Sequence, residues 1–181
     1  MQRVLAAGFA AGMRPKAHVD QFTSLGGVAI AIQLGAISVD HLEVTNAADS
    51  MLLAQSDTLG VVIPAANVNL GLSHHAPARD LVDAGVALAL CTDLNPGSAP
   101  CYSLPLVMGL ACRYMKLLPA EAFNAATINA AYAAGCGERL GSLEAGKQAD
   151  LLVVDVPDYR HIPYYLGGNP VRQVIKHGRV I

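Results

Sequence analysis

The sequence has no apolar run of about 18 residues, the minimum for a membrane-spanning helix, and no recognisable signal peptide. We therefore expect a cytoplasmic protein that does not enter a membrane. The chain has four cysteines but no CxxC pair, which is typical of reduced thiols in the cytosol. Charged residues make up only 14% of the chain and the formal net charge is −2, so no basic surface for nucleic acid is expected.

The chain is rich in apolar residues, and segments with strand-like and helix-like patterns alternate along it. Of its 181 residues, 53% are hydrophobic, which is enough for one sizeable core. Short apolar strands are expected over 15–19, 37–39, 59–63 and 86–90, with helices between them over 26–34, 47–55 and 76–84. An earlier helix should end near residue 12. This alternation predicts an α/β fold in which parallel strands are joined by right-handed crossovers.

The pattern changes beyond residue 100. Helices are expected over 104–117 and 119–134, each with a proline near its start. Strands over 149–154 and 171–177 then flank a segment rich in Pro, Tyr and Gly. We predict that residues 1–138 form the last four strand–helix units of a partial (β/α)8 TIM-type barrel. Residues 139–181 should supply strands of a small accessory β-sandwich. A closed barrel needs eight such units.

Three of the expected strands end at a side chain capable of catalysis. His18 ends the first strand, His41 ends the second, and Asp93 follows the fourth, just before the Asn-Pro-Gly turn at 95–97. Barrel enzymes carry their catalytic groups at the carboxyl ends of the strands, so we expect these three side chains around one mouth. A lone histidine there is more often structural, but the shared position favours a site. Imidazole and carboxylate are ligands of catalytic zinc or iron, which lower the pKa of a bound water nucleophile.

Six motifs spread over nearly the whole chain resemble one enzyme family. They are Lys16–Gln21 (KAHVDQ), Ser38–Glu43 (SVDHLE), Thr92–Gly97 (TDLNPG), Ala126–Ala131 (ATINAA), Gly141–Asp150 (GSLEAGKQAD) and Gly167–Val171 (GGNPV). Together they resemble the carboxyl-terminal part of the imidazolonepropionases, which belong to the amidohydrolase superfamily. The segment around Gly146 and Lys147 is typical of the superfamily at large. The Asp93 loop together with the His18 segment narrows the resemblance to this family.

The resemblance implies a hydrolase that opens a C–N bond in a cyclic amide, 4-imidazolone-5-propanoate, giving N-formimidoyl-L-glutamate in histidine degradation. It implies one divalent metal ion, zinc or iron, with His18 and Asp93 among its ligands. His41 would polarise the carbonyl under attack or move a proton, which suits a near-neutral pKa. Asp93 would accept a proton from the water and deliver it to the leaving nitrogen.

The resemblance also assigns substrate contacts to Gln21, Asn95, Gly97 and Ser98. Gln21 would hydrogen-bond the substrate ring, and the other three would line the site through side-chain and backbone hydrogen bonds. Considered without the family, Gln21 is more simply a surface amide and residues 95–98 an ordinary turn. The resemblance suggests a homodimer for the intact enzyme, acting on a small-molecule substrate.

One departure from the family pattern is large. Amidohydrolases carry a His-x-His pair on the first barrel strand that supplies two further metal ligands, and this sequence has none. His74 and His75 are adjacent, and adjacent strand residues point to opposite faces, so we interpret them as loop residues. We therefore expect a fragment that lacks the amino-terminal half. Alone it should bind metal weakly, turn over little substrate and associate through its open sheet.

Two alternatives stay open. Another amidohydrolase, such as a purine or pyrimidine aminohydrolase, would share the two histidines and the aspartate at the strand ends, but not usually the Asn-Pro-Gly loop. A non-catalytic remnant that binds a partner through an exposed sheet would need none of these residues. A substrate panel would distinguish the first alternative from an imidazolonepropionase. Metal analysis and size-exclusion chromatography of the isolated chain would test the second.

Overall fold

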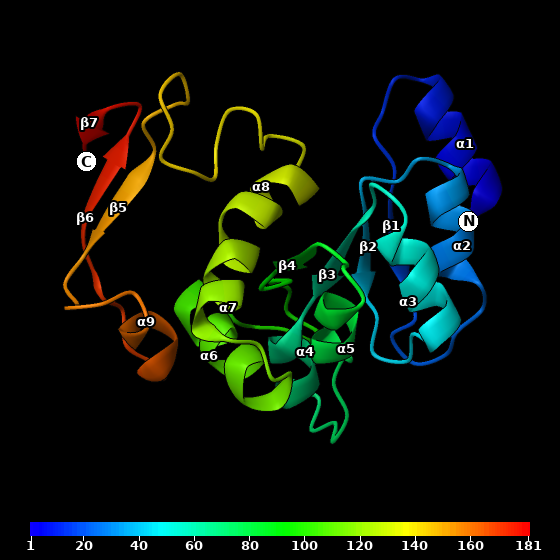
Figure 1. Ribbon diagram of the computed structural model, residues 1–181, viewed down its shortest axis with the longest axis horizontal. Helices are drawn as coiled ribbons and strands as arrows, with labels where there is room; N and C mark the ends of the chain where they lie inside the picture. Colours follow the sequence, from blue (N-terminus) through cyan, green and yellow to red (C-terminus); the bar gives the residue numbers. More distant parts are fainter.

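The computed structural model describes every residue from Met1 to Ile181 and contains seven strands in two sheets together with nine helices (Figure 1). The strands are β1 (Lys16–Val19), β2 (Ser38–His41), β3 (Leu59–Val62), β4 (Leu88–Leu90), β5 (Leu151–Val154), β6 (Val171–Lys176) and β7 (Arg179–Val180). The helices are α1 (Gln2–Ala10), α2 (Gly27–Gln33), α3 (Ala47–Ala54), α4 (Pro64–Asn69), α5 (Ala78–Asp83), α6 (Leu104–Tyr114), α7 (Pro119–Ala126), α8 (Ile128–Ala133) and α9 (His161–Tyr164).

The first four strands form one parallel sheet in chain order, β1-β2-β3-β4. Helix α2 joins β1 to β2, α3 joins β2 to β3, and α4 and α5 join β3 to β4. The predicted α/β fold with four consecutive parallel strands is therefore confirmed. The register aligns His18 with Asp40, Asp40 with Val61 and Val61 with Ala89, so these four residues form a row on one face of the sheet.

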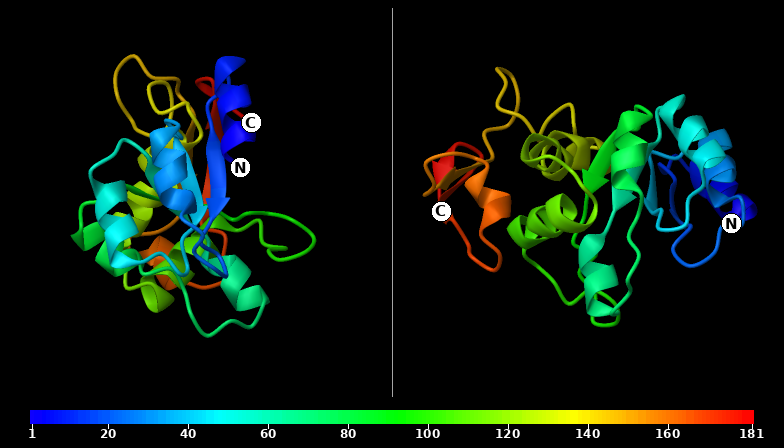
Figure 2. Two further views of the ribbon diagram at one scale, coloured as in Figure 1. Left: turned by 90° about the vertical axis from the view of Figure 1, so that its right-hand side faces the viewer. Right: turned by 60° about the horizontal axis from the view of Figure 1, so that its bottom comes forward.

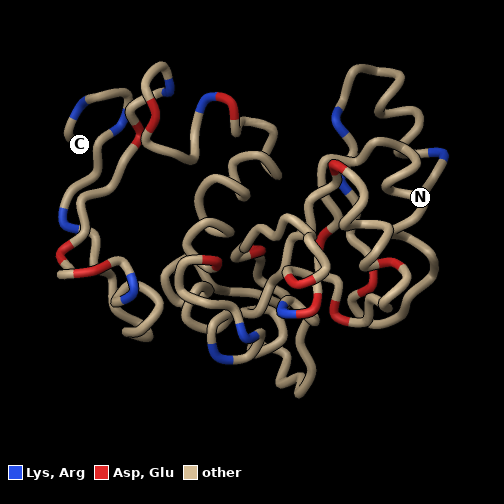
Figure 3. The backbone as a smooth tube through the Cα atoms, viewed as in Figure 1, with Lys and Arg blue, Asp and Glu red and all other residues tan.

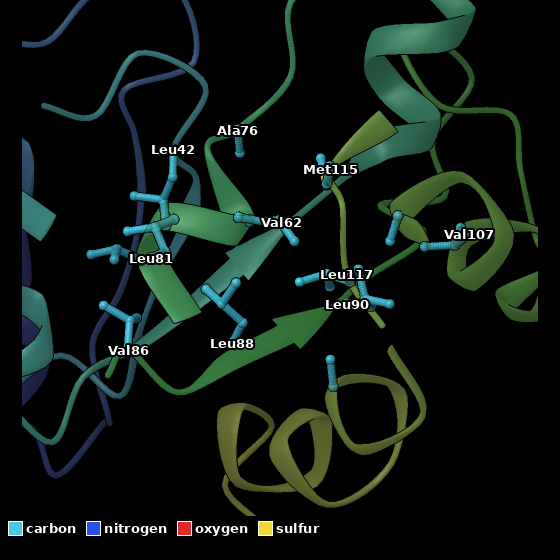
Figure 4. Packing of buried hydrophobic residues seen from close by; sticks show 14 of the residues in the cluster. Leu42, Val62, Ala76, Leu81, Val86, Leu88, Leu90, Val107, Met115 and Leu117 are labelled. Atoms are coloured by element: carbon cyan, nitrogen blue, oxygen red, sulfur yellow. The ribbon is translucent and has the colours of Figure 1, made fainter. Parts of the chain in front are cut away.

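Both faces of the sheet are covered on its β3–β4 side. Val62, Leu88 and Leu90 lie on one face and pack in the main hydrophobic cluster, together with Leu81 of α5 and Val107 of α6 (Figure 4). On the opposite face, Val61 and Ala89 pack against Ala133 of α8. A fully buried Val or Leu side chain contributes roughly 1.5–3 kcal/mol, so this two-sided burial explains the continuous apolar runs of β3 and β4.

The helix predicted over 119–134 is divided in two. Thr127, with φ −119° and ψ −93°, leaves helical geometry between α7 and α8. Its hydroxyl donates a hydrogen bond of 2.7 Å to the carbonyl of Phe123, a side-chain bond that competes with the helix's own ladder and bends helices. Helix α4 was not predicted; it begins at Pro64, where the missing N–H and fixed φ of proline suit a first helical position.

The last three strands form a separate antiparallel sheet, β5-β6-β7. In Figure 1 it lies at one end of the molecule, with α6 to α8 between it and the parallel sheet, and the right panel of Figure 2 shows the same arrangement. Strands β5 and β6 were predicted, whereas α9 and the short β7 were not. Arg113 connects α9 to α6, because its guanidinium donates hydrogen bonds of 2.9 Å to the carbonyls of Pro163 and Tyr164.

Charged side chains are interspersed along the chain (Figure 3). Several form ion pairs, such as Arg160 with Asp158 at 2.7 Å and Arg79 with Glu121 at 2.8 Å.

None of the helices has the length and apolar character needed to cross a membrane.

Candidate active site

His18 and His41 meet at the carboxyl edge of the parallel sheet. Their ring centroids lie 4.1 Å apart, with the planes tilted by 46°. The register pairs His41 with Val19, so regular strand alternation would put the two imidazoles on opposite faces. His41 departs from this alternation because its φ of +90° takes the end of β2 out of regular strand geometry. Three side chains, His18, His41 and Asp93, were expected to converge at this edge, and the structure places the two histidines in contact.

Backbone strain is concentrated at this edge. Of the six non-glycine residues with positive φ, four lie at or just after the ends of β1, β2 and β4: Asp20, His41, Leu42 and Asp93. Such a conformation is most unfavourable for a bulky residue such as Leu42, whose side chain is fully buried. Strain of this kind costs of order 1–3 kcal/mol per residue and clusters at functional sites, so the edge is a candidate site on backbone geometry alone.

Each histidine is followed two residues later by a buried acid. Asp20 accepts a hydrogen bond of 3.0 Å from the hydroxyl of Thr45 through one carboxylate oxygen, while its other oxygen is buried without a partner. Glu43 has a completely buried side chain, and its Oε1 lies 3.5 Å from Nδ1 of His41. No role was predicted for these two acids, although the His-x-acid spacing is repeated at both strand ends.

His75 approaches the same region from the segment between α4 and α5. Its ring stacks on that of Tyr114 with centroids 4.8 Å apart. Burial lowers the pKa of His75, and the nearby charge of Glu43 opposes that effect by raising it. The side-chain amide of Asn67 donates a hydrogen bond of 2.8 Å to the carbonyl of His74 and so anchors the segment between α4 and α5. The two histidines lie outside the helices and strands, as the sequence predicted.

Asp93 lies in a loop organised by Asn95. The amide of Asn95 donates to the carbonyl and to a carboxylate oxygen of Asp93, and its oxygen accepts from the backbone N–H groups of Gly97 and Ser98, both at 2.8 Å. Asp93 also donates its own N–H to the sulfur of Cys91. Burial raises the pKa of that thiol, and the N–H of Asp93 opposes the shift. The backbone donors expected to face substrate are used inside the loop.

Gln21 is half-buried and borders a hollow of about 360 Å³ at the end of β1. His18 and Asp20 line the same hollow. Gln21 therefore has access to the space beside His18. The contact with the substrate ring that the resemblance implies for Gln21 stays a prediction.

No group of three or more His, Cys, Asp or Glu side chains is arranged to hold a metal ion. The structure brings His18 to His41, whereas Asp93 follows β4, separated from β2 by one intervening strand. The available donors at the edge are imidazole and carboxylate, the set that zinc and iron accept.

Comparison of sequences identifies relatives over the whole chain. The profile of the amidohydrolase family matches residues 5–181. The chain is 56% identical over 180 residues to an imidazolonepropionase of Chloroflexus aggregans and 52% identical to one of Herpetosiphon aurantiacus. Each alignment covers 99% of this chain and 42% of the relative, so the chain spans less than half of the length of these relatives.

Solved structures share the fold. An adenosine deaminase from Xanthomonas campestris with bound zinc superposes with a TM-score of 0.82 at 26% identity, covering 99% of this chain and 47% of that one. An atrazine chlorohydrolase from Arthrobacter aurescens, complexed with zinc and atraton, has the same TM-score and coverage at 19% identity. The guanine deaminase of E. coli has a TM-score of 0.77 at 17% identity, covering 99% of this chain and 49% of that one.

Proposed function

The chain belongs to the amidohydrolase family, and from this we propose that it carries catalytic residues of an imidazolonepropionase, which hydrolyses 4-imidazolone-5-propanoate to N-formimidoyl-L-glutamate. The observation that carries the proposal is the contact of the His18 and His41 rings at a strained sheet edge. The 56% identity to the Chloroflexus aggregans enzyme supports the choice of substrate.

The donors at this edge fit a divalent metal ion. His18 is solvent-exposed at the end of β1, and Asp93 is half-buried at the end of β4, so both can reach a ligand. We propose that these two residues hold zinc or iron, each being compatible with mixed nitrogen and oxygen ligands. When bound, the ion supplies Lewis-acid activation of the attacking water.

His41 and Asp93 would move the protons. Water adds to the ring carbonyl, the carbon–nitrogen bond breaks, and the proton taken from water ends on the leaving nitrogen. In the proposed mechanism Asp93 accepts that proton and delivers it. His41 takes up a proton on Nε2, donates it to the carbonyl oxygen as negative charge develops there, and recovers it when the carbonyl re-forms.

Gln21 is proposed to hydrogen-bond the substrate ring from the hollow that it shares with His18. Asn95, Gly97 and Ser98 are proposed to border the opposite side of the substrate. Because Asn95 already binds the N–H groups of Gly97 and Ser98, its main contribution would be to hold the loop in shape.

For the fold, we propose that residues 1–138 are half of a (β/α)8 barrel and that residues 139–181 form part of an accessory β-sandwich. The parallel order β1-β2-β3-β4 and the separate antiparallel sheet support this division. A homodimer is the proposed assembly of the intact enzyme.

A chimera tests the activity. This chain would replace the matching region of the Chloroflexus aggregans enzyme, to which it is 56% identical. The expected result is formation of N-formimidoyl-L-glutamate from 4-imidazolone-5-propanoate in the presence of zinc or iron. A chimera that binds metal and yet forms no product would contradict the proposal.

Variants of the chimera separate the roles. His41→Gln should retain metal and lose about 10²–10⁴-fold in kcat, the usual contribution of a proton-transfer group. His18→Ala should lose metal as well as activity. His74→Gln is the matched control, because His74 lies in the α4–α5 segment, and it should leave both unchanged.

A substrate panel addresses the aminohydrolase alternative. Guanine and adenine would be offered beside 4-imidazolone-5-propanoate. The 56% identity to an imidazolonepropionase, against 26% to an adenosine deaminase, favours the cyclic amide. Product from a purine but not from the imidazolone would reverse this choice. Binding of a partner by a metal-free, inactive chain would favour the non-catalytic alternative.

A further inference from the structure

Glu43 is a buried carboxylate without an evident structural role. Its side chain has no exposed surface, and neither of its oxygens has a hydrogen-bond partner. Burying an unpaired carboxylate is strongly unfavourable, whereas an apolar residue of similar size would cost nothing of this kind. A group this costly to bury points to a function at the position.

The complementary atom is on His41. Nδ1 of His41 is also buried without a hydrogen-bond partner, and it lies 3.5 Å from Oε1 of Glu43. A neutral imidazole carries one proton, on either Nδ1 or Nε2. A proton on Nδ1 allows the ring to donate to the carboxylate, which satisfies both buried atoms at once. Hydrogen bonds in sites without substrate are often long and shorten in the working complex.

The surroundings leave this pairing without competition from Asp20. One oxygen of Asp20 accepts from Thr45 and the other has no partner, whereas the ion-pair contact of the His41 ring is with Glu43. Asp40, the carboxylate within β2, accepts a hydrogen bond of 2.8 Å from the hydroxyl of Ser38. His75 feels the charge of Glu43, so the carboxylate lies among imidazoles and without a lysine or arginine partner. Its nearest complement is the ring of His41.

We propose that Glu43 is a positioning residue for His41. It accepts a hydrogen bond from Nδ1–H of His41, holds the ring against His18, and leaves the lone pair of Nε2 free for the reacting groups. The catalytic consequence rests on the function proposed above, whereas the tautomer is a property of this chain alone. Catalytic and metal-binding histidines are commonly oriented by such an acceptor on the second ring nitrogen.

Nitrogen NMR of the 181-residue chain tests the tautomer. The histidine rings would be labelled with ¹⁵N, and spectra recorded at a pH where free histidine is neutral. The spectrum of His41→Gln identifies the signals of His41. The expected result is a proton on Nδ1 of His41, the form that free histidine in water disfavours.

Three substitutions complete the test. Glu43→Leu removes the acceptor with little change in volume and should shift the His41 tautomer ratio toward Nε2–H by about tenfold or more, the factor that a charge-assisted hydrogen bond supplies. Glu43→Gln keeps a carbonyl acceptor and should restore Nδ1–H in part. Glu121→Gln makes the same charge change on α7, where the carboxylate binds Arg79, and should leave His41 unaltered.

A proton on Nε2 rather than Nδ1 in the wild-type chain would overturn the proposal, and it does so whether or not Glu43→Leu folds. An unchanged ratio in a folded Glu43→Leu chain would overturn it too. These outcomes are independent of the chimera, whose inactivity would refute the proposed function and leave the Glu43–His41 hydrogen bond standing.

Discussion

Asn95 binds Asp93 twice, donating from Nδ2 to the carbonyl oxygen at 2.7 Å and to Oδ2 at 3.3 Å. The same side chain accepts the N–H groups of Gly97 and Ser98. One amide thus closes the loop and fixes the carboxylate of Asp93, whose φ of +49° is unfavourable without such support.

Removing that amide should misplace Asp93. We expect Asn95→Ala in the chimera to lower kcat/KM by about 10–100-fold, as loss of a residue that orients a metal ligand commonly does. Zinc affinity should fall with it. The matched control is Asn69→Ala, because Asn69 touches the loop only at the carbonyl of Ser98, 3.0 Å away. Equal losses in the two variants would contradict the role assigned to Asn95.

Arg79 of α5 and Glu121 of α7 form a two-pronged ion pair. The guanidinium nitrogens lie 2.8 and 3.0 Å from the two carboxylate oxygens, and Oε2 also accepts the N–H of Leu118. We expect Glu121→Gln to lower the free energy of unfolding only slightly, because an ion pair at the surface is weak even when its geometry is good. A double-mutant cycle with Arg79→Met, which keeps the apolar stem, isolates the pair in urea unfolding. A coupling energy near zero would show that the pair contributes nothing.

Asp150 makes stability depend on pH. The N–H of His177 and the ammonium of Lys176 lower its pKa from 3.8 to about 2. A carboxylate with a lowered folded-state pKa stabilises the folded chain fully above its ordinary pKa, and that contribution is lost as pH falls toward the folded value. The stability difference between wild type and Asp150→Asn should therefore shrink between pH 3.8 and about 2. Urea unfolding across this window measures it, and a difference that stays constant would contradict the prediction.

Much of the fold could be predicted because it depends on local pattern. The short apolar runs placed β1 to β4, and the structure caps α3 and α6 locally, because Asn46 and Ser103 accept the N–H groups of Asp49 and Leu106. The break at Thr127 was missed because a hydroxyl that bonds back to Phe123 leaves no mark in the hydrophobic periodicity.

The candidate site was only partly predictable. His18 and His41 could be placed at the same edge, but strand alternation assigns them to opposite faces, and the φ of +90° that brings their rings together is a tertiary effect. Glu43 was missed because its burial is also a tertiary effect. An acid in a loop after a strand is ordinarily solvated, and nothing local signals that this one is buried.

The exposed side of β1 leads to the last prediction. Strand β1 pairs only with β2, so its other edge carries unpaired backbone groups. Apolar side chains around it are largely exposed: Phe9 of α1 by 62%, Leu25 before α2 by 85%. An open edge beside exposed apolar groups favours association, so the chain should form larger species as its concentration rises.

Light scattering after size-exclusion chromatography measures this association. Combining Phe9→Ser with Leu25→Ser should reduce it, since each removes exposed apolar surface next to the edge. Leu143→Ser is the matched control, because Leu143 is 82% exposed but precedes the antiparallel sheet at the other end of the molecule. If Leu143→Ser reduced association as much as the Phe9→Ser and Leu25→Ser double variant, association would not depend on the β1 edge. A wild-type chain that stays monomeric at every concentration would contradict the prediction.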